Sequence, residues 1–210
     1  MSQEFDSPVA TQQAGPATGP PSGATRLVTW HDDLVVWVDQ LGWLRTVNDW
    51  LTAALGPFRE RHQDNLALEL LHGGRWVGHP LHPALSDLPI GLWTGATVLD
   101  VTDRSPAPRP GLDAAGMLSA AGILAACATA LTGLSDWTVS NEQDRRVGLL
   151  HGLLNTAALG LQSVSLGARM TGHRGTARAM GAASLTVTAA AGYLGGHLVF
   201  TKGVMVNRVG

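Results

Sequence analysis

The sequence predicts an all-α integral membrane protein, built as a four-helix bundle preceded by amphipathic, partly interfacial helices and a disordered N-terminal tail. Only 14% of its 210 residues are charged, against about 25% in typical soluble domains. The C-terminal two thirds hold four apolar segments, and each supplies the roughly 20 residues that a bilayer core requires. A soluble bundle of buried helices is the alternative, and four consecutive apolar segments with so few charges count against it.

The N-terminal third divides into a tail and a helical region. The first 25 residues are rich in proline, glycine, serine, threonine and glutamine and contain no apolar run, which indicates a disordered tail rather than a signal peptide. Residues 26–56 recover helical periodicity, with a break near Gly42 and an end at Gly56 and Pro57. A further short helix is expected over 57–72, beginning at the proline. The predicted divisions of the chain are 1–25 (tail), 26–77 (amphipathic helices), 78–206 (transmembrane domain) and 207–210 (C-terminal end).

Tryptophan is spaced regularly along the first helical region. Trp30 and Trp37 lie seven residues apart, as do Trp43 and Trp50, so each pair lies on one face of a helix. That face either packs on the rest of the protein or lies in the membrane interface, where tryptophan is favoured. The two interpretations are compatible, and membrane lipid is therefore an expected partner.

Four membrane spans are expected, separated by segments that collect the helix breakers and the charges. Their predicted bounds are 83–102, 111–134, 147–168 and 178–201. Small and polar residues recur at helical spacing on each span, which is typical of helix–helix contacts in membranes. We therefore expect a compact antiparallel bundle.

Polar side chains gather at one end of this bundle. The start of the first and third spans and the end of the second and fourth lie on the same side of an antiparallel bundle. The residues concerned are His79, His82, Asp87, Asp136, Trp137, Arg145, Arg146, His151, Asn155 and His197. Ionisable groups inside a membrane domain need partners, so we predict a functional site at this end. The opposite end carries Asp100, Asp103, Arg104, Asp113 and Arg169, which we interpret as a structural ring of charges.

Three chemistries suit the predicted site. His151 and His197 come from antiparallel helices and could supply both axial ligands of a b-type haem. They could instead bind a non-haem metal, with Asp87, Asp136 or His82 completing the coordination. The third chemistry is a quinone pocket in which histidine and aspartate carry protons. No side chain is predicted to be catalytic. The candidate cofactor-binding residues are His79, His82, His151, Asn155 and His197.

A purely structural network explains the same residues differently. Asp87 would accept a hydrogen bond from His151 or His197, and the network would fix how the helices pack. His79 and His82 each precede a proline, which favours an extended backbone, so they would be turn residues at the end of the bundle. The other members of this network are Asp136, which would accept from Arg145, together with Trp137 and Arg146.

Composition excludes several kinds of partner and cofactor. The net charge is −2 and no basic patch exceeds two adjacent arginines, so nucleic-acid binding has no support. The single cysteine, Cys127, excludes an intrachain disulfide and any iron–sulfur cluster held only by this chain's thiolates. His72 is a weaker candidate than His79 and His82, and three further histidines, His31, His62 and His173, are expected to be solvated and not to carry a cofactor.

Four segments of the chain carry a family resemblance. They read GHPLHPALSDLPIGLWTG, TGLSDW, RRVGLLHGLLN and GYLGGHLVF, in that order. Over roughly residues 70–206 the chain resembles the bacterial domain-of-unknown-function family 2231. In actinobacteria this family is a four-span membrane domain that is commonly fused or adjacent to a Rieske-type iron–sulfur domain. The positions that match the family are His79, His82, Asp87, Asp100, Asp136, Trp137, Arg146, His151, Asn155, Gly195, Gly196 and His197.

The resemblance implies the fold and a redox context. We therefore expect a membrane-embedded electron-transfer subunit that links a separate Rieske-type protein, or another soluble oxidoreductase, to the quinone pool. The alternative is a non-catalytic anchor or assembly protein whose tryptophan-rich helices recruit a soluble complex. A homo-oligomer is compatible with either function. The expected location is the bacterial plasma membrane, with both termini in the cytoplasm, because the N-terminal region carries no signal sequence.

Overall fold

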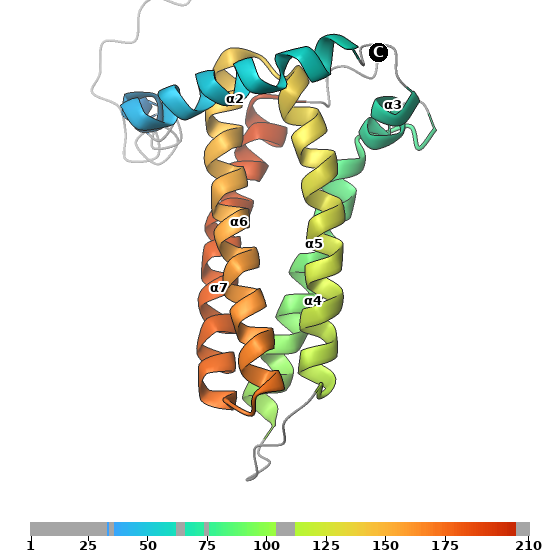
Figure 1. The fold of residues 1–210 in the computed structure, drawn as a ribbon, viewed down its shortest axis with the longest axis vertical. Helices are drawn as coiled ribbons and strands as arrows, with labels where there is room; N and C mark the ends of the chain where they lie inside the picture. The colour runs from blue at the N-terminus through green and yellow to red at the C-terminus, as the bar shows by residue number, and fades with distance from the viewer. Residues whose placement is uncertain (1–32, 34–35, 62–65, 74–75, 104–111, 205–210) are drawn as a thin grey trace, which may run out of the picture.

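The protein is described by a computed structural model that covers residues 33, 36–61, 66–73, 76–103 and 112–204 (Figure 1). Four long antiparallel helices form a bundle, and further helices gather at one end of it. The helices are α2 (Gly42–Arg61), α3 (Leu66–His72), α4 (Leu81–Thr102), α5 (Ala114–Val139), α6 (Glu142–Met170), α7 (Arg174–Gly196) and the π-helix η1 (His197–Thr201). The predicted tail, the C-terminal end 207–210, Trp30, His31, His62 and Arg104 lie outside the described residues.

Two hairpins make up the bundle. α4 packs along α5 and α6 packs along α7, while α5 with α6 and α4 with α7 make less extensive contacts. Three of the described helices, α5, α6 and α7 extended by η1, are long and apolar enough to cross a membrane. α4 has 22 residues, or about 33 Å of helix, but His82, Asp87 and two prolines lower its hydropathy. The predicted all-α membrane fold is confirmed.

The two hairpins bury equivalent positions. The buried residues of α4 are Pro89, Trp93, Ala96 and Asp100, and those of α6 include Ala158, Gln162, Ser165 and Arg169, each 69 residues later. α5 and α7 correspond with an offset of 62 residues, since Ala115 and Ser135 are buried in α5 where Ala177 and His197 are buried in α7 and η1. The hairpins run in the same direction, which is the arrangement of a parallel repeat about an axis along the bundle. Polar residues that face this axis therefore come in pairs.

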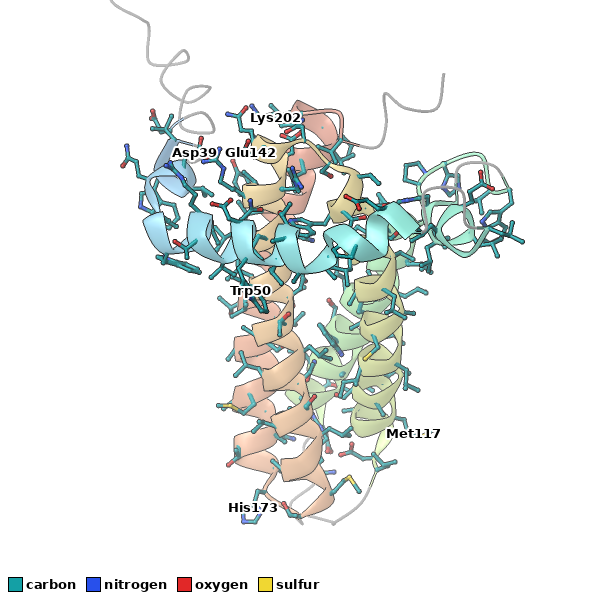
Figure 2. The ribbon with its side chains drawn as sticks, turned by 45° about the horizontal axis from the view of Figure 1, so that its top comes forward. Asp39, Trp50, Met117, Glu142, His173 and Lys202 are labelled. Atoms are coloured by element: carbon teal, nitrogen blue, oxygen red, sulfur yellow. The ribbon has the colours of Figure 1, made fainter. Side chains whose placement is uncertain are left out.

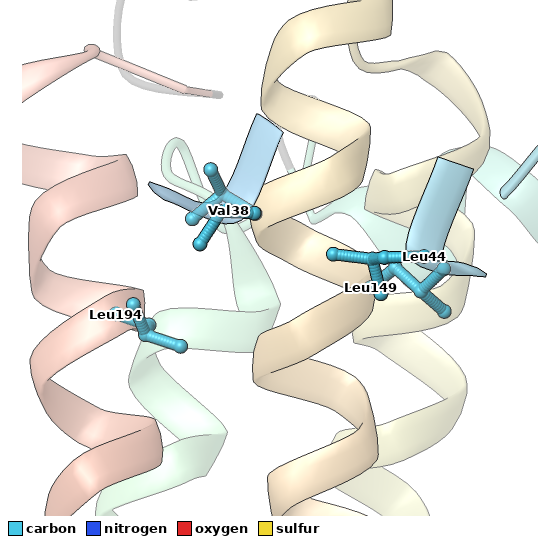
Figure 3. Packing of buried hydrophobic residues seen from close by; sticks show 5 residues of the cluster. Val38, Leu44, Leu149 and Leu194 are labelled. Carbon is cyan, nitrogen blue, oxygen red and sulfur yellow. The ribbon is translucent and has the colours of Figure 1, made fainter. Parts of the chain in front are cut away.

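α2 lies across one end of the bundle (Figure 1). Val38, just before α2, and Leu44 within it are buried together with Val147 and Leu149 of α6 and Leu194 of α7 (Figure 3). These side chains fix the helix on the ends of α6 and α7 by removing apolar surface from water. The expectation that a face of this region packs on the rest of the protein is confirmed for the face of Val38 and Leu44, whereas Trp37, Trp43 and Trp50 are exposed.

Two boundaries differ from the prediction. A helical turn over 36–40 ends before Gly42, as expected, but α2 then continues through Pro57. Pro57 lies in the last two turns of α2, where its missing N–H removes one backbone hydrogen bond. The helix predicted to begin at this proline is therefore part of α2, and α3 is separate. α5 and α6 extend beyond their predicted spans and leave only Ser140 and Asn141 between them, because the Asn141 side chain caps α6.

Candidate functional site

Two histidines, one from each hairpin, face the bundle axis near the end that α2 covers. His82 lies in the first turn of α4, and His151 lies in α6 at the same offset of 69 residues. Their ring centres are 6.1 Å apart and their ring planes are nearly perpendicular, at 89°. We call them the paired histidines. Their contact joins the two hairpins.

Each paired histidine hydrogen-bonds a main-chain carbonyl within its own hairpin. His82 Nδ1 lies 3.0 Å from the oxygen of Thr129, and His151 Nδ1 lies 2.8 Å from the oxygen of Ala191. A carbonyl oxygen only accepts, so we assign a hydrogen to Nδ1 in both rings. In the neutral rings Nε2 is then the nitrogen that can accept a hydrogen bond or bind a metal. Asn155 Nδ2 donates to Nε2 of His151 at 3.0 Å.

A glycine beside each ring makes room for it. A Cβ atom added at Gly133 would lie 2.7 Å from Cε1 of His82, and one added at Gly195 would lie 2.9 Å from Cε1 of His151. Any other residue would therefore displace the ring, because packed interiors leave no room for such an overlap. The same combination of a carbonyl and a glycine one turn later thus positions both histidines.

Trp93 and Gln162 form a second equivalent pair further along the axis. Only 2% of Trp93 and 1% of Gln162 is exposed. Within the described part of the chain, neither Trp93 Nε1 nor Gln162 Oε1 has a hydrogen-bond partner. The first atom is a donor and the second an acceptor. This level of the bundle therefore offers both kinds of group to a small bound molecule such as water.

The third equivalent pair, Asp100 and Arg169, belongs to a network of charges at the far end. The two form a buried ion pair, and Arg169 also approaches Asp113 at 3.5 Å. Arg174 bridges Asp103 and Asp113 at 2.6 and 2.8 Å. The predicted structural ring of charges is confirmed for its four described members, and the sequence interpretation missed two of its arginines. The six members are Asp100, Asp103, Asp113, Arg169, Arg174 and Arg178.

Asp136 finds its partner in α3. His72 Nδ1 lies 2.7 Å from Asp136 Oδ1, and Ser135 Oγ lies 3.4 Å from His72 Nε2. The expectation that Asp136 accepts from Arg145 is therefore corrected, and His72, the weaker candidate from the sequence, lies against Asp136 at this end of the bundle. The reason is that α3 is a separate helix whose last turn reaches the end of α5. The sequence carries no local signal for this contact between residues 64 positions apart.

Replacing His72 with alanine should release α3 from the bundle. The substitution removes both hydrogen bonds of His72 and leaves Asp136 Oδ1 without this partner. The free energy of local opening of α3 should therefore fall by about 1–3 kcal/mol. Hydrogen exchange of the α3 amides measures this change, with His79→Ala as the matched control because His79 is exposed. Equal exchange in the two variants would show that other contacts hold α3.

Three other predicted site residues lie around the paired histidines. His197 is buried in η1, with 5% of it exposed. Trp137 Nε1 donates to the carbonyl oxygen of Arg145 at 2.8 Å and so joins the ends of α5 and α6. Arg146 forms an ion pair with Asp39 at 3.3 Å, which ties the segment before α2 to α6. The contacts of Trp137 and Arg146 thus join α5, α6 and the segment before α2 at this end of the bundle.

Asp87 faces away from the site. It is exposed on α4, so the expected hydrogen bond to His151 or His197 is not formed. Five residues of helix place it about 140° around the axis from His82, which points inward. Among the described residues no three His, Cys, Asp or Glu side chains lie close enough to hold one metal ion. His79 is also exposed, with its Nδ1 3.1 Å from its neighbour's carbonyl oxygen, as expected for a turn.

Residues 78–208 match a protein family described as "Predicted membrane protein (DUF2231)". No curated protein and no solved structure matches the chain. The matched segment includes α4 to η1, and with them all three equivalent pairs, but leaves out α2 and α3.

Proposed function

The chain belongs to the DUF2231 family of predicted membrane proteins, and we propose that it is an electron-transfer subunit whose paired histidines hold a b-type haem. The spacing of His82 and His151 carries this proposal. A metal binds an imidazole nitrogen at about 2 Å, so two imidazoles that held one metal between them would have ring centres no more than roughly 6 Å apart. The ring centres of the paired histidines are 6.1 Å apart.

The hydrogen bonds of the paired histidines also suit axial ligands. In a metal-bound histidine the other ring nitrogen usually donates to a carbonyl or carboxylate, and Nδ1 does so in both His82 and His151. One adjustment is required, since Asn155 has to release Nε2 of His151. Asn155 can keep its other hydrogen bond, to the main-chain oxygen of His151 at 3.0 Å. His82 thus takes the place that the sequence-based hypothesis gave to His197.

A haem supplies reversible one-electron transfer. The proposed subunit would pass electrons between a soluble partner, either a separate Rieske-type protein or another oxidoreductase, and the quinone pool. All four bundle helices would cross the bacterial plasma membrane, with the paired histidines near the cytoplasmic side. The resemblance to a Rieske-associated family and the facing histidines support this assignment.

Visible spectroscopy of the protein purified from bacterial membranes tests the proposal. We expect the Soret and α/β absorption bands of a b-type haem in the wild-type protein. His82→Ala and His151→Ala should each lose these bands, because each removes one axial ligand. His79→Ala is the matched control and should keep them, since His79 is exposed in a turn.

Three results would overturn the proposal. A wild-type protein without a Soret band and without iron in elemental analysis holds no haem. Bands that persist in His82→Ala and disappear in His197→Ala would assign the axial ligands to His151 and His197 instead. A change in band position alone in His82→Ala, with iron retained, would show that His82 is close to the haem without binding it.

A further inference from the structure

α2 has one face against the bundle and a tryptophan face beside it. At about 100° per residue, Leu44, Asn48 and Leu51 share the bundle face. Leu44 is fully buried, and the exposed fraction of Asn48 is 2%. Trp43 and Trp50 lie about 120° around the helix from this face. They are 53% and 67% exposed. The buried face therefore fixes the direction in which the two indoles point.

The charged residues of α2 occupy a third face. Arg45 and Asp49 are exposed and lie roughly 110–150° around the helix from the tryptophans. Figure 2 shows Asp39 and Glu142 on one side of α2 and Trp50 on the other, beside the length of the bundle. Trp50 thus faces along the bundle, and helix geometry turns Arg45 and Asp49 away from the tryptophan side.

We propose that α2 lies in the membrane interface, with Trp43 and Trp50 inserted at the level of the lipid headgroups. Trp50 lies beside the length of the bundle (Figure 2), and three of the bundle helices are able to cross a membrane. A bilayer around those spans therefore meets the tryptophan face of α2. Indole combines an apolar ring with one N–H donor, and it is favoured where hydrocarbon meets water. A soluble protein would have to enter the bilayer to reach the same face.

This placement also sets the depth of the paired histidines. Val147 of α6 packs in the cluster that holds α2, and His151 follows it by four residues, or about 6 Å of helix. The paired histidines then lie about one helical turn below the interface. The depth itself does not depend on the proposed function. Its meaning for electron transfer does, because this depth would bring the proposed haem within reach of a soluble partner.

Spin labels at single cysteines in the full chain test the placement of α2. The background is Cys127→Ser, because Cys127 is exposed on α5. The variants Trp43→Cys and Trp50→Cys report on the tryptophan face, and Arg45→Cys and Asp49→Cys are matched controls on the charged face. In phosphatidylcholine–phosphatidylglycerol vesicles, we expect the ratio of oxygen accessibility to nickel-chelate accessibility to be several-fold higher at 43 and 50 than at 45 and 49.

The possible results separate the occupants of this face. Labels at 43 and 50 that are as accessible to the nickel chelate as those at 45 and 49 would place the tryptophans in water and overturn the proposal. Labels at 43 and 50 that neither reagent reaches would show a protein contact, either a second copy or a partner, and would also overturn it. The labels respond to lipid whether or not haem is bound, so a failed haem spectrum leaves this test intact.

Discussion

Replacing Arg169 with leucine is expected to destabilise the bundle by about 3–5 kcal/mol, the typical cost of removing one partner from a buried ion pair. Arg169 is only 3% exposed and contacts the carboxylates of Asp100 and Asp113. Without it Asp100, which is 9% exposed, would keep a buried charge whose remaining partner among the described residues is the more distant Arg178. Titration of the protein with sodium dodecyl sulfate in mixed micelles, followed by circular dichroism, measures the change in unfolding free energy.

Two variants show whether the loss comes from the buried charge. Arg169→Leu combined with Asp100→Leu removes both members of the pair and should recover much of the stability, because an apolar pair often replaces a buried ion pair without net cost. Arg45→Leu alters an exposed arginine of α2 and should stay within about 0.5 kcal/mol of the wild type. If Arg169→Leu is as stable as Arg45→Leu, the charge network does not hold the far end of the bundle together.

The positions of the membrane helices were predictable, because the length of each apolar segment and the helix-breaking residues between the segments determine them. The first predicted span, 83–102, differs from α4 only at its start. The predicted gap between the second and third spans was too long, because helices continue outside a bilayer where side chains satisfy their ends. Asn141 caps α6, and Trp137 donates to the carbonyl oxygen of Arg145. Hydropathy alone carries no information about such polar contacts.

The partner of His151 was harder to predict. The prolines suggest that the first span opens at Pro83, which leaves His82 in a turn. In the structure Pro80 precedes the helix, so His82 lies in the first turn of α4 and points inward. A helix that starts two residues earlier includes His82, so its side chain takes a helical direction, which is about 100° per residue from its neighbours. Errors of that size are normal at helix ends. His82 is a candidate ligand from the sequence, but His197 is the predicted partner of His151, because the prediction places His82 just outside the helix.

The equivalence of the two hairpins was not visible in the sequence. Trp93 corresponds to Gln162, and Asp100 corresponds to Arg169. These two pairs differ in residue type, and His82 with His151 and Gly133 with Gly195 are too few identical positions to reveal a repeat by residue type alone. Burial reveals the correspondence, because both hairpins present the same positions to the axis. The sequence predicts that Asp100 and Arg169 lie at the charged end of the bundle, but it does not predict that they occupy equivalent positions and form an ion pair.

The glycines beside the paired histidines test this equivalence through stability. Gly133→Ala and Gly195→Ala would place a Cβ atom 2.7 and 2.9 Å from the rings of His82 and His151. Each ring would have to move from its carbonyl partner, and overpacking of this kind costs about 1–3 kcal/mol. Gly160→Ala is the matched control, because a Cβ there meets nothing within 4 Å. That variant should be neutral or more stable, since alanine favours a helix over glycine by about 1 kcal/mol.

The sign of these changes decides between two descriptions of the site. If Gly133→Ala and Gly195→Ala both lose stability while Gly160→Ala does not, the two histidines are held by the same combination of a carbonyl and a glycine. A destabilised Gly195→Ala beside an unchanged Gly133→Ala would mean that only His151 is fixed, and the equivalence would not extend to this end of the bundle. The stability change is expected with or without a bound haem. Under the proposed function both variants should also lose the haem absorption, because a displaced ring can no longer present Nε2 to the iron.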